Sequence, residues 1–223
     1  MTAEKENTPR EIALENRETE GDRLFSPSVA RNRDAIRNVI LAEMPKTGKF
    51  LEVGAGTGEH AIHMASALPN IQWYTGDPDP SSRASIAAWI ETSGLTNLRG
   101  PHEIDVSVSE WGVENDAPFS GLVSINMIHI APFEAAIGLF SAAGRLLDPG
   151  GRLFLYGPFS RAGEHTAPSN EAFDASLKSR DQRWGVRDID HNLIPLAKKN
   201  QLTLKTIVEM PANNLSLIFE KQH

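Results

Sequence analysis

Along most of the chain, short apolar runs alternate with longer segments in which apolar residues recur every third or fourth position. The short runs are typical of buried strands, and the longer segments are typical of amphipathic helices. Strands are predicted at Lys49–Val53, Ile71–Thr75, His102–Ile104, Gly121–Ile125 and Arg152–Tyr156. The helices predicted between them cover Glu59–Leu68, Arg83–Thr92 and Phe133–Leu147. Strands that alternate with helices of this length indicate βαβ units and a parallel sheet.

The last part of the chain departs from this alternation. A helix predicted around Ile189–Asn200 is followed directly by two strand-like runs, Leu202–Glu209 and Leu215–Glu220. The link Met210–Asn214 is too short for a helical crossover, so these two strands must be antiparallel. The predicted fold is therefore α/β and doubly wound, with a mostly parallel seven-stranded sheet that includes an antiparallel C-terminal strand pair.

Capping residues in the sequence predict where two of the helices begin. Ser26 followed by Pro27 is typical of an N-cap and the first helical position, and it predicts a helix that runs to about Leu41. Ser81 is the candidate N-cap of the helix at Arg83–Thr92.

Composition divides the chain into a short arm and one domain. Residues 1–22 hold seven acids and three bases with few large apolar residues, so we expect a flexible acidic arm there. The chain has 223 residues, of which 40% are hydrophobic and 23% charged, close to the average for soluble proteins. Residues 23–223 are therefore expected to form a single domain.

Charge and residue usage exclude several classes of protein. The net charge is −7, of which the arm carries more than half, and no basic stripe suited to nucleic acid is present. No apolar run approaches the ~18 residues that would cross a membrane, and the first residues do not resemble a secretory signal. The chain has no cysteine. We therefore expect a cytoplasmic protein that binds neither nucleic acid nor membranes, and we leave its oligomeric state open.

The sharpest motif follows the first predicted strand, where Glu52 precedes glycines at positions 54, 56 and 58. Glycine permits a positive φ and lets a ligand approach the backbone closely. A dinucleotide fingerprint would need its third glycine at position 59, which is Glu59. An acid on the first turn of the helix opposes a pyrophosphate. The spacing favours a ligand that has no phosphate and has an amino group for the carboxylate.

The sequence Glu52-Val-Gly-Ala-Gly-Thr-Gly58 resembles motif I of the class I S-adenosylmethionine-dependent methyltransferases, which have a Rossmann-like fold. The turn Leu146–Gly151 resembles the L-x-P-G-G turn of the same superfamily. The resemblance implies that Asp77, at the end of the second strand, holds the ribose hydroxyls of S-adenosyl-L-methionine. It further implies a set of cofactor-binding residues: Glu52, Gly54, Gly56, Gly58, His60, Asp77, Asp105, Val106 and Asn126.

A closer resemblance runs from about residue 23 to the C-terminus. It is to an uncharacterised family of bacterial methyltransferase-like proteins that is defined as a domain of unknown function. The stretches that carry it are Ile125–Ile130, Leu155–Phe159, His165–Asp174, Trp184–Asp188 and Met210–Leu217. This resemblance implies the cofactor and methyl transfer to a small-molecule acceptor, but it supplies no acceptor.

Ligands of doubly wound sheets bind at the carboxyl ends of the strands, so catalytic candidates must follow the fourth and fifth strands. His129 is the first choice for a base because an unperturbed imidazole titrates near 6.5; the alternative is a hydrogen-bonded core histidine. Tyr156 could orient an acceptor oxygen or could simply be packed. The polar loop Ser160–Asn170 is expected to be a lid with His165 and Asn170 pointing inward beside Tyr156 and His129.

His60 and His63 lie at i, i+3 on one helix face, but no further ligands match them, so no metal is expected. The preferred function is a methyltransferase that holds a small acceptor in line with the methyl group. Two other functions remain open. One is a non-catalytic module of the same fold that binds or senses S-adenosylmethionine. The other is a nicotinamide-dependent oxidoreductase, which Glu59 disfavours.

Overall fold

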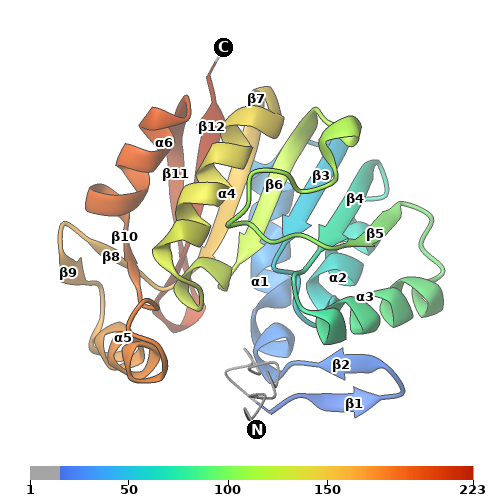
Figure 1. The fold of residues 1–223 in the computed structure, drawn as a ribbon, viewed down its shortest axis with the longest axis horizontal. Helices are drawn as coiled ribbons and strands as arrows, with labels where there is room; N and C mark the ends of the chain where they lie inside the picture. Colours follow the sequence, from blue (N-terminus) through green and yellow to red (C-terminus); the bar gives the residue numbers. More distant parts are fainter. Residues whose placement is uncertain (1–15, 223) are drawn as a thin grey trace, which may run out of the picture.

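The computed structural model describes residues 16–222 and has a twisted seven-stranded sheet at its centre (Figure 1). The strand order is β11-β12-β7-β6-β3-β4-β5. The neighbours from β7 to β5 pair in parallel, whereas β12 pairs antiparallel with both β7 and β11. The strands span β3 (Gly48–Val53), β4 (Ile71–Gly76), β5 (Leu98–His102), β6 (Phe119–Ile125), β7 (Leu147–Gly157), β11 (Leu202–Met210) and β12 (Asn214–Lys221). The predicted doubly wound sheet with an antiparallel C-terminal pair is confirmed.

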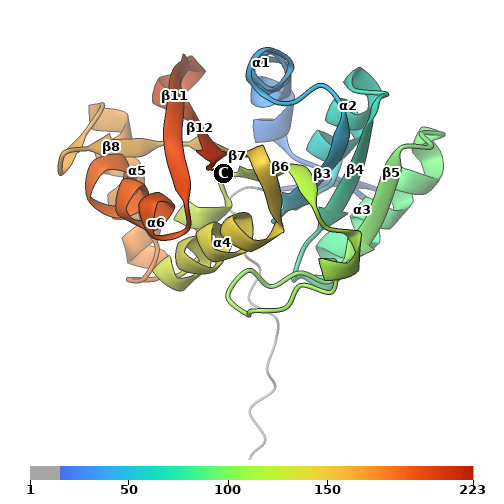
Figure 2. The same ribbon diagram turned by 90° about the horizontal axis from the view of Figure 1, so that it is seen from above.

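Helices cover both faces of this sheet, as Figure 2 shows. The helices α1 and α2 pack on one face, and α4 and α6 pack on the other. Successive strand residues point to opposite faces, so Phe50 joins the first layer while Leu51 joins the second. The longer helices span α1 (Pro27–Glu43), α2 (Glu59–Ala67), α3 (Pro80–Ser93), α4 (Phe133–Leu146), α5 (Pro168–Arg180) and α6 (Ile194–Lys199).

Two small sheets and several short helical turns lie outside the central sheet. Strands β1 (Glu18–Glu20) and β2 (Arg23–Phe25) form an antiparallel hairpin. Strands β8 (Phe159–Arg161), β9 (Glu164–His165) and β10 (Arg187–Asp188) form a second small sheet. Short helical turns lie at Glu114–Asp116, Met127–His129, Ile189–Leu193 and Pro211–Asn213.

Two predicted boundaries in the β4–α3–β5 region are wrong. The N-cap of α3 is Asp79 rather than Ser81, because the Asp79 carboxylate accepts from the Ser82 backbone N–H at 2.8 Å and Pro80 occupies the first turn. Strand β5 ends at His102, where the predicted strand began. Gly100 and Pro101 concealed β5, which tolerates a proline because it lies at the edge of the sheet.

Regular structure also begins earlier than the sequence suggested. Strand β1 lies inside the predicted arm 1–22, and residues 1–15 of that arm lie outside the described residues. The hairpin packs through β2 onto α3, where the rings of Phe25 and Trp89 meet edge to face with centroids 5.1 Å apart. Strand β1 is therefore held, through its pairing with β2, by apolar contacts with α3.

The segment Ser160–Asn170 is not the polar loop that we predicted. It contains most of the β8–β9 hairpin and the first turn of α5. The helix escaped detection because two of its three buried residues, Asn170, Asp174 and Leu177, are polar. Apolar periodicity cannot reveal a helix whose buried face is hydrophilic.

Candidate functional site

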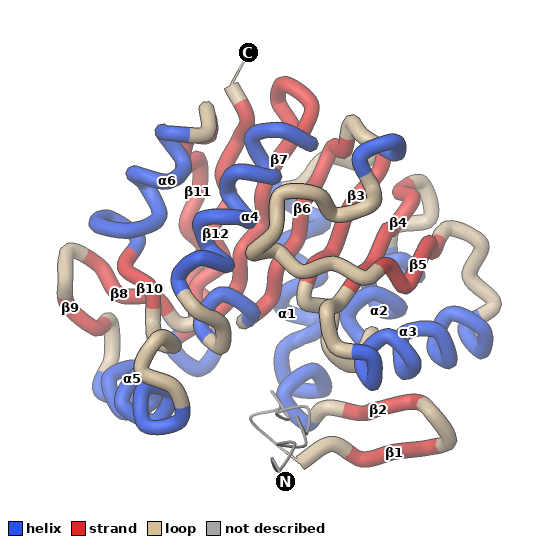
Figure 3. Tube along the Cα trace, in the orientation of Figure 1, coloured by secondary structure: helices blue, strands red, loops and turns tan. Residues whose placement is uncertain are grey.

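A cavity of about 2060 Å³ lies at the carboxyl ends of the parallel strands. The β1–β2 hairpin borders it on one side and α5 on the other, with α1 between them (Figures 1 and 3). Pockets for one small molecule have volumes of roughly 300–1,000 Å³, so this cavity has room for two ligands. Its position is the one at which doubly wound sheets bind their ligands.

The glycine loop between β3 and α2 forms one wall of the cavity. Gly56 has a φ of +58°, and a Cβ there would meet only the Arg17 guanidinium, at 3.6 Å. The backbone at Gly56 is therefore open to a ligand. Gly58 does not line the cavity; it precedes α2 with a φ of +88°, and a Cβ there would lie 3.1 Å from Ile86.

Asp77 fixes the glycine loop relative to the start of α3. Its Oδ2 accepts from the Gly56 backbone N–H at 2.9 Å, and its Oδ1 accepts from that of Asp79 at 2.9 Å. Burial raises the pKa of this carboxyl group, against the effect of these two hydrogen bonds. Asp77 faces the cavity at the end of β4, where the resemblance placed a ribose-binding acid.

Glu52 lies deeper, at the end of β3, with only 1% of its surface exposed. Its Oε2 accepts from the Trp73 indole N–H at 2.9 Å. Burial raises the pKa of Glu52 to about 8, and the nearby Asp77 adds to the rise while the Trp73 hydrogen bond opposes it. A cation in the cavity would restore its charge, because an opposite charge within a few ångströms favours ionisation. The residue therefore suits a ligand with an ammonium or sulfonium group.

His60 belongs to a group of neighbouring polar side chains that line the cavity. Its Nε2 lies 2.9 Å from the Asn32 Oδ1, and burial with the neighbouring His63 and Arg33 lowers the pKa of His60 to about 3. Burial raises the pKa of the Tyr156 hydroxyl, and the nearby side chains of Asn32 and Asn214 oppose this rise. His60 is thus neutral and faces the cavity with Asn32 and Tyr156.

The remaining predicted cofactor residues also line the cavity. Asp105 and Val106 follow β5, and the Asp105 Oδ1 accepts from both the backbone and the hydroxyl of Ser107. Asn126 ends β6 in a left-handed conformation (φ +60°), and its N–H donates to the Tyr156 carbonyl at 2.8 Å. Asparagine tolerates this conformation better than most residues, which explains its place at this turn.

His129 does not have the properties of a base that titrates near neutrality. Its side chain is 0% exposed, and neither ring nitrogen has a hydrogen-bond partner. Burial, together with the nearby Arg187, lowers the His129 pKa to about 3. The ring packs against Phe159 with centroids 4.9 Å apart, and its Nε2 lies against Gly157, where a Cβ would approach it to 2.5 Å. The hydrogen-bonded core histidine that we considered as an alternative is not observed either.

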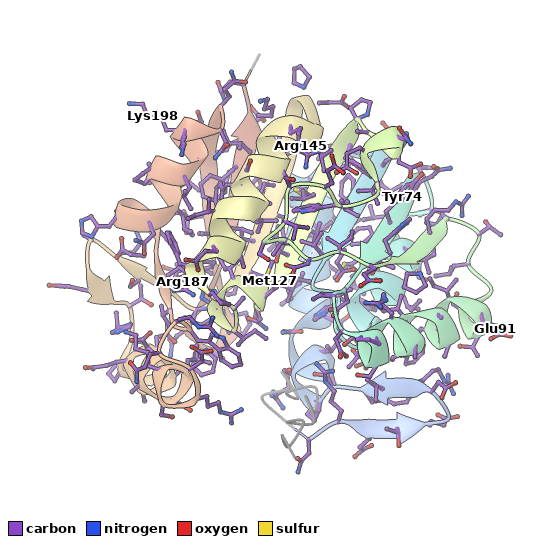
Figure 4. The ribbon with its side chains drawn as sticks, in the orientation of Figure 1. Tyr74, Glu91, Met127, Arg145, Arg187 and Lys198 are labelled. Carbon is purple, nitrogen blue, oxygen red and sulfur yellow. The ribbon has the colours of Figure 1, made fainter. Side chains whose placement is uncertain are left out.

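Arg187 holds the turn that carries His129. Its guanidinium donates to the Ile128 carbonyl at 2.9 Å and to the Ala131 carbonyl at 2.6 Å, while the Gly185 N–H donates to the His129 carbonyl. Figure 4 shows Arg187 and Met127 at the lower end of the sheet. This turn is therefore set by a segment far along the chain.

The structure separates the other two catalytic candidates. His165 lies in β9 with its Nε2 3.6 Å from Asp174, and it is not among the cavity-lining residues, so the expected inward position is wrong. Asn170 does line the cavity. Its amide N–H groups donate to the Thr166 hydroxyl at 3.0 Å and to the Asn213 carbonyl at 2.9 Å, which joins α5 to the β11–β12 turn.

Sequence reasoning missed the contribution of the N-terminal hairpin and of Asn32. The Ser85 hydroxyl accepts from the Leu24 N–H at 2.8 Å and donates to the Thr57 carbonyl at 2.7 Å, so one side chain joins the hairpin to the glycine loop. Glu59 does not face the cavity; its carboxylate binds the Ser26 N–H and the Thr57 hydroxyl. Glu59 would therefore not face a pyrophosphate bound in the cavity, and our electrostatic argument against such a ligand does not hold.

Comparisons with solved structures assign the fold. The chain is similar to the S-adenosylmethionine-dependent methyltransferase SibL in its apo form (TM-score 0.69, 18% identity, 88% of this chain and 57% of that one). It is also similar to an O-methyltransferase family protein from Burkholderia thailandensis (TM-score 0.69, 13% identity, 86% and 60%). The calicheamicin biosynthesis methyltransferase CalO1 with bound SAH is a third such structure (TM-score 0.66, 17% identity, 86% and 55%). The chain spans less than two thirds of each of these proteins.

The chain thus has the fold of these methyltransferases. Residues 23–221 match the family model described as "Protein of unknown function (DUF938)". The chain belongs to this DUF938 family.

Residues 16–222 contain neither a membrane-spanning helix nor a cluster of metal ligands. Within that range, no helix is both long enough and apolar enough to cross a membrane. No three histidine, aspartate or glutamate side chains of the same range gather in a way that could hold a metal ion.

Proposed function

We propose that this protein binds S-adenosyl-L-methionine and transfers its methyl group to a small-molecule acceptor. The observation that carries the proposal is the juxtaposition of Glu52, the open backbone at Gly56 and Asp77 along one wall of the cavity. S-adenosylmethionine supplies an electrophilic methyl group on a sulfonium and needs partners for an ammonium and a ribose.

The residues present fit this cofactor. The open side of Gly56 allows a ligand to lie against the backbone, and buried Glu52 gains its charge when a cation is near. Asp77, Asp105 and Val106 follow the two neighbouring strands, so they lie in a row suited to a ribose and an adenine. The volume of about 2060 Å³ leaves space for an acceptor beyond the methyl group.

Catalysis in this site would rest on position rather than on a strong base. His129 and His60 are neutral groups whose pKa values lie near 3, and His165 is outside the cavity. Alignment of a nucleophile about 3 Å from the methyl carbon can itself supply several kcal/mol of the barrier reduction. We therefore no longer assign a proton-transfer role to His129 or His165, and we retain Tyr156 and Asn170 as residues that orient the acceptor.

Two alternatives make different predictions. A non-catalytic module would bind the cofactor and its demethylated product without turnover, and an oxidoreductase would bind NADH or NADPH. Calorimetric titration with S-adenosylmethionine, S-adenosylhomocysteine and both nicotinamide cofactors separates the oxidoreductase from the other two, and methyl transfer to an acceptor separates the enzyme from the binding module. We expect micromolar binding of the first two and none of the nicotinamides; the reverse pattern overturns the proposal.

A further inference from the structure

We propose that the end of the cavity beside α5 binds an uncharged polar acceptor, recognised by a band of neutral side chains formed by Asn32, Asn126, Tyr156, Asn170 and Asn214. This inference rests on the proposed function and names the substrate class for the same site. We call these five residues the amide band.

The members of the amide band are neighbours in the structure. The side chains of Asn32 and Asn214 lie near the Tyr156 hydroxyl. The Asn126 N–H donates to the Tyr156 carbonyl, and the Asn170 amide donates to the Asn213 carbonyl, which adjoins Asn214. All five members line the cavity, and they come from α1, the turn after β6, β7, α5 and β12. The tertiary structure therefore gathers primary amides from distant parts of the chain onto one wall.

The charges along the cavity are distributed unevenly. The half that the cofactor would occupy carries one base, Arg17, and the acids Asp22, Glu52, Asp77, Asp79 and Asp105. In the half beside α5, the charged residues that line the cavity are Arg31, Glu134 and Arg183, and all three are exposed. Asn170 and Tyr156, which are buried there, are uncharged at neutral pH. A charged group placed against the band would lose its hydration without a buried counter-charge.

This uneven distribution of charge favours an uncharged ligand at the end of the cavity beside α5. Burying an unpaired charge costs far more than burying an uncharged group whose hydrogen bonds are satisfied. The Asn170 amide uses both of its N–H groups inside the protein and keeps its oxygen as an acceptor, whereas the Tyr156 hydroxyl can both donate and accept, so the band can satisfy a hydroxyl or an amide. Phe173 and the side chains of Pro211 and Ala212 in the β11–β12 turn add apolar surface beside the band. The site therefore suits a polar, uncharged molecule with an apolar part.

Three planar probes of the same shape test the proposal: benzamide is neutral, benzoate is an anion and benzamidine is a cation. Each is titrated into the full chain saturated with S-adenosylhomocysteine, and the side-chain amide signals of Asn126, Asn170 and Asn214 are followed by ¹H–¹⁵N NMR. We expect benzamide to shift these signals and to bind about tenfold or more tightly than either charged probe.

A matched pair of variants places a charge beside the band. Ser169 lies at the edge of the cavity in the first turn of α5 and accepts from the Asn213 amide at 3.0 Å. Ser169→Asp keeps an acceptor there and favours the helix N-terminus, so the fold should persist. We expect Ser169→Asp to strengthen benzamidine binding by about tenfold, whereas the neutral Ser169→Asn should leave the preference for benzamide unchanged.

Each outcome has one meaning. Tighter binding of benzoate or benzamidine by the parent protein overturns the proposal, and so does failure of all three probes to shift the amide signals. If the parent protein does not bind S-adenosylhomocysteine in the calorimetric titration, the proposed function is overturned instead. The probes are then titrated in the absence of S-adenosylhomocysteine, and tighter binding of benzamide would still support an uncharged ligand at this end of the cavity.

Discussion

The backbone N–H of Ser26 donates to the Oε2 of Glu59 at 2.7 Å, although the two residues are 33 positions apart. The same oxygen accepts from the Thr57 hydroxyl at 3.0 Å. Glu59 therefore joins the residue that caps α1 to the loop whose glycines face the cavity. The position of the N-terminal segment and the shape of the glycine loop are coupled through one buried carboxylate.

Glu59→Ala should lower the free energy of unfolding by about 1–3 kcal/mol, because the buried Ser26 N–H loses its acceptor. Urea denaturation measures this change. Glu91→Ala is the control, since Glu91 is exposed on α3, and it should alter the stability by less than about 0.5 kcal/mol. Equal effects of the two substitutions would contradict the coupling.

Gly56→Val should reduce S-adenosylmethionine affinity by about a hundredfold or more, because the new side chain occupies the space where the ligand must lie. Calorimetry of the purified variant measures the affinity. The left-handed backbone also penalises valine, so the control must share that cost. Gly94→Val does: Gly94 has a φ of +66°, lies outside the cavity and has nothing within 4 Å of its Cβ position. Equal affinity in both variants would place the cofactor elsewhere.

Glu52 makes both stability and cofactor affinity depend on pH. Its folded pKa of about 8 exceeds its ordinary value of 4.5, so the folded state holds the proton more tightly than the unfolded state does. This contribution to stability is complete below about pH 4.5 and is lost as the pH rises toward 8. Stability measured from pH 5 to 8 should therefore fall more steeply for the parent than for Glu52→Gln.

Binding of a cationic cofactor should reverse this protonation. At pH 7, we expect S-adenosylmethionine binding to release up to about one proton from the parent, and fewer from Glu52→Gln. Calorimetry in two buffers of different ionisation enthalpy measures the number released. Equal release by both proteins would mean that Glu52 does not face the cationic part of the ligand.

His129→Leu should change the free energy of unfolding by less than about 1.5 kcal/mol in either direction, because it replaces an unpaired buried imidazole with an apolar group of similar volume. S-adenosylmethionine affinity should not change. In the parent, ¹⁵N NMR should show a neutral His129 ring down to pH 4.5, since its pKa is about 3. A large loss of stability, or a ring that protonates near pH 6, would refute this account of the residue.

The N-terminal hairpin should contribute to cofactor affinity through Trp89. The Trp89 indole donates to the Leu24 carbonyl at 3.2 Å and its ring packs on Phe25, while Arg23 lies 4.9 Å above it. Trp89→Ala should weaken S-adenosylmethionine binding by about tenfold, whereas Trp89→Phe retains the ring and should weaken it by less than about threefold. Calorimetry distinguishes the two; equal affinity of Trp89→Ala and the parent would remove the hairpin from the site.

The sequence by itself determined which segments form four of the five parallel strands, the glycine loop and the acid at the end of each of the first two strands. These features are local: apolar runs mark buried strands, and a glycine marks a backbone that needs a positive φ or a close approach. The carboxyl ends of parallel strands meet along one edge of the sheet, so Glu52 and Asp77 had to lie near each other. Eight of the nine predicted cofactor residues accordingly line the cavity.

Only the tertiary structure decided which polar residues beyond the loop can reach a ligand. His129 is part of the cavity wall but is fully buried there, because Arg187, 59 residues away from Ile128, binds the carbonyls of its turn. Asn32 faces the cavity because α1 packs beside α2, and α5 is held by polar contacts that leave no apolar pattern. Burial, and with it the pKa of an imidazole or carboxyl group, depends on which distant segments pack around it, and no spacing along the chain encodes that.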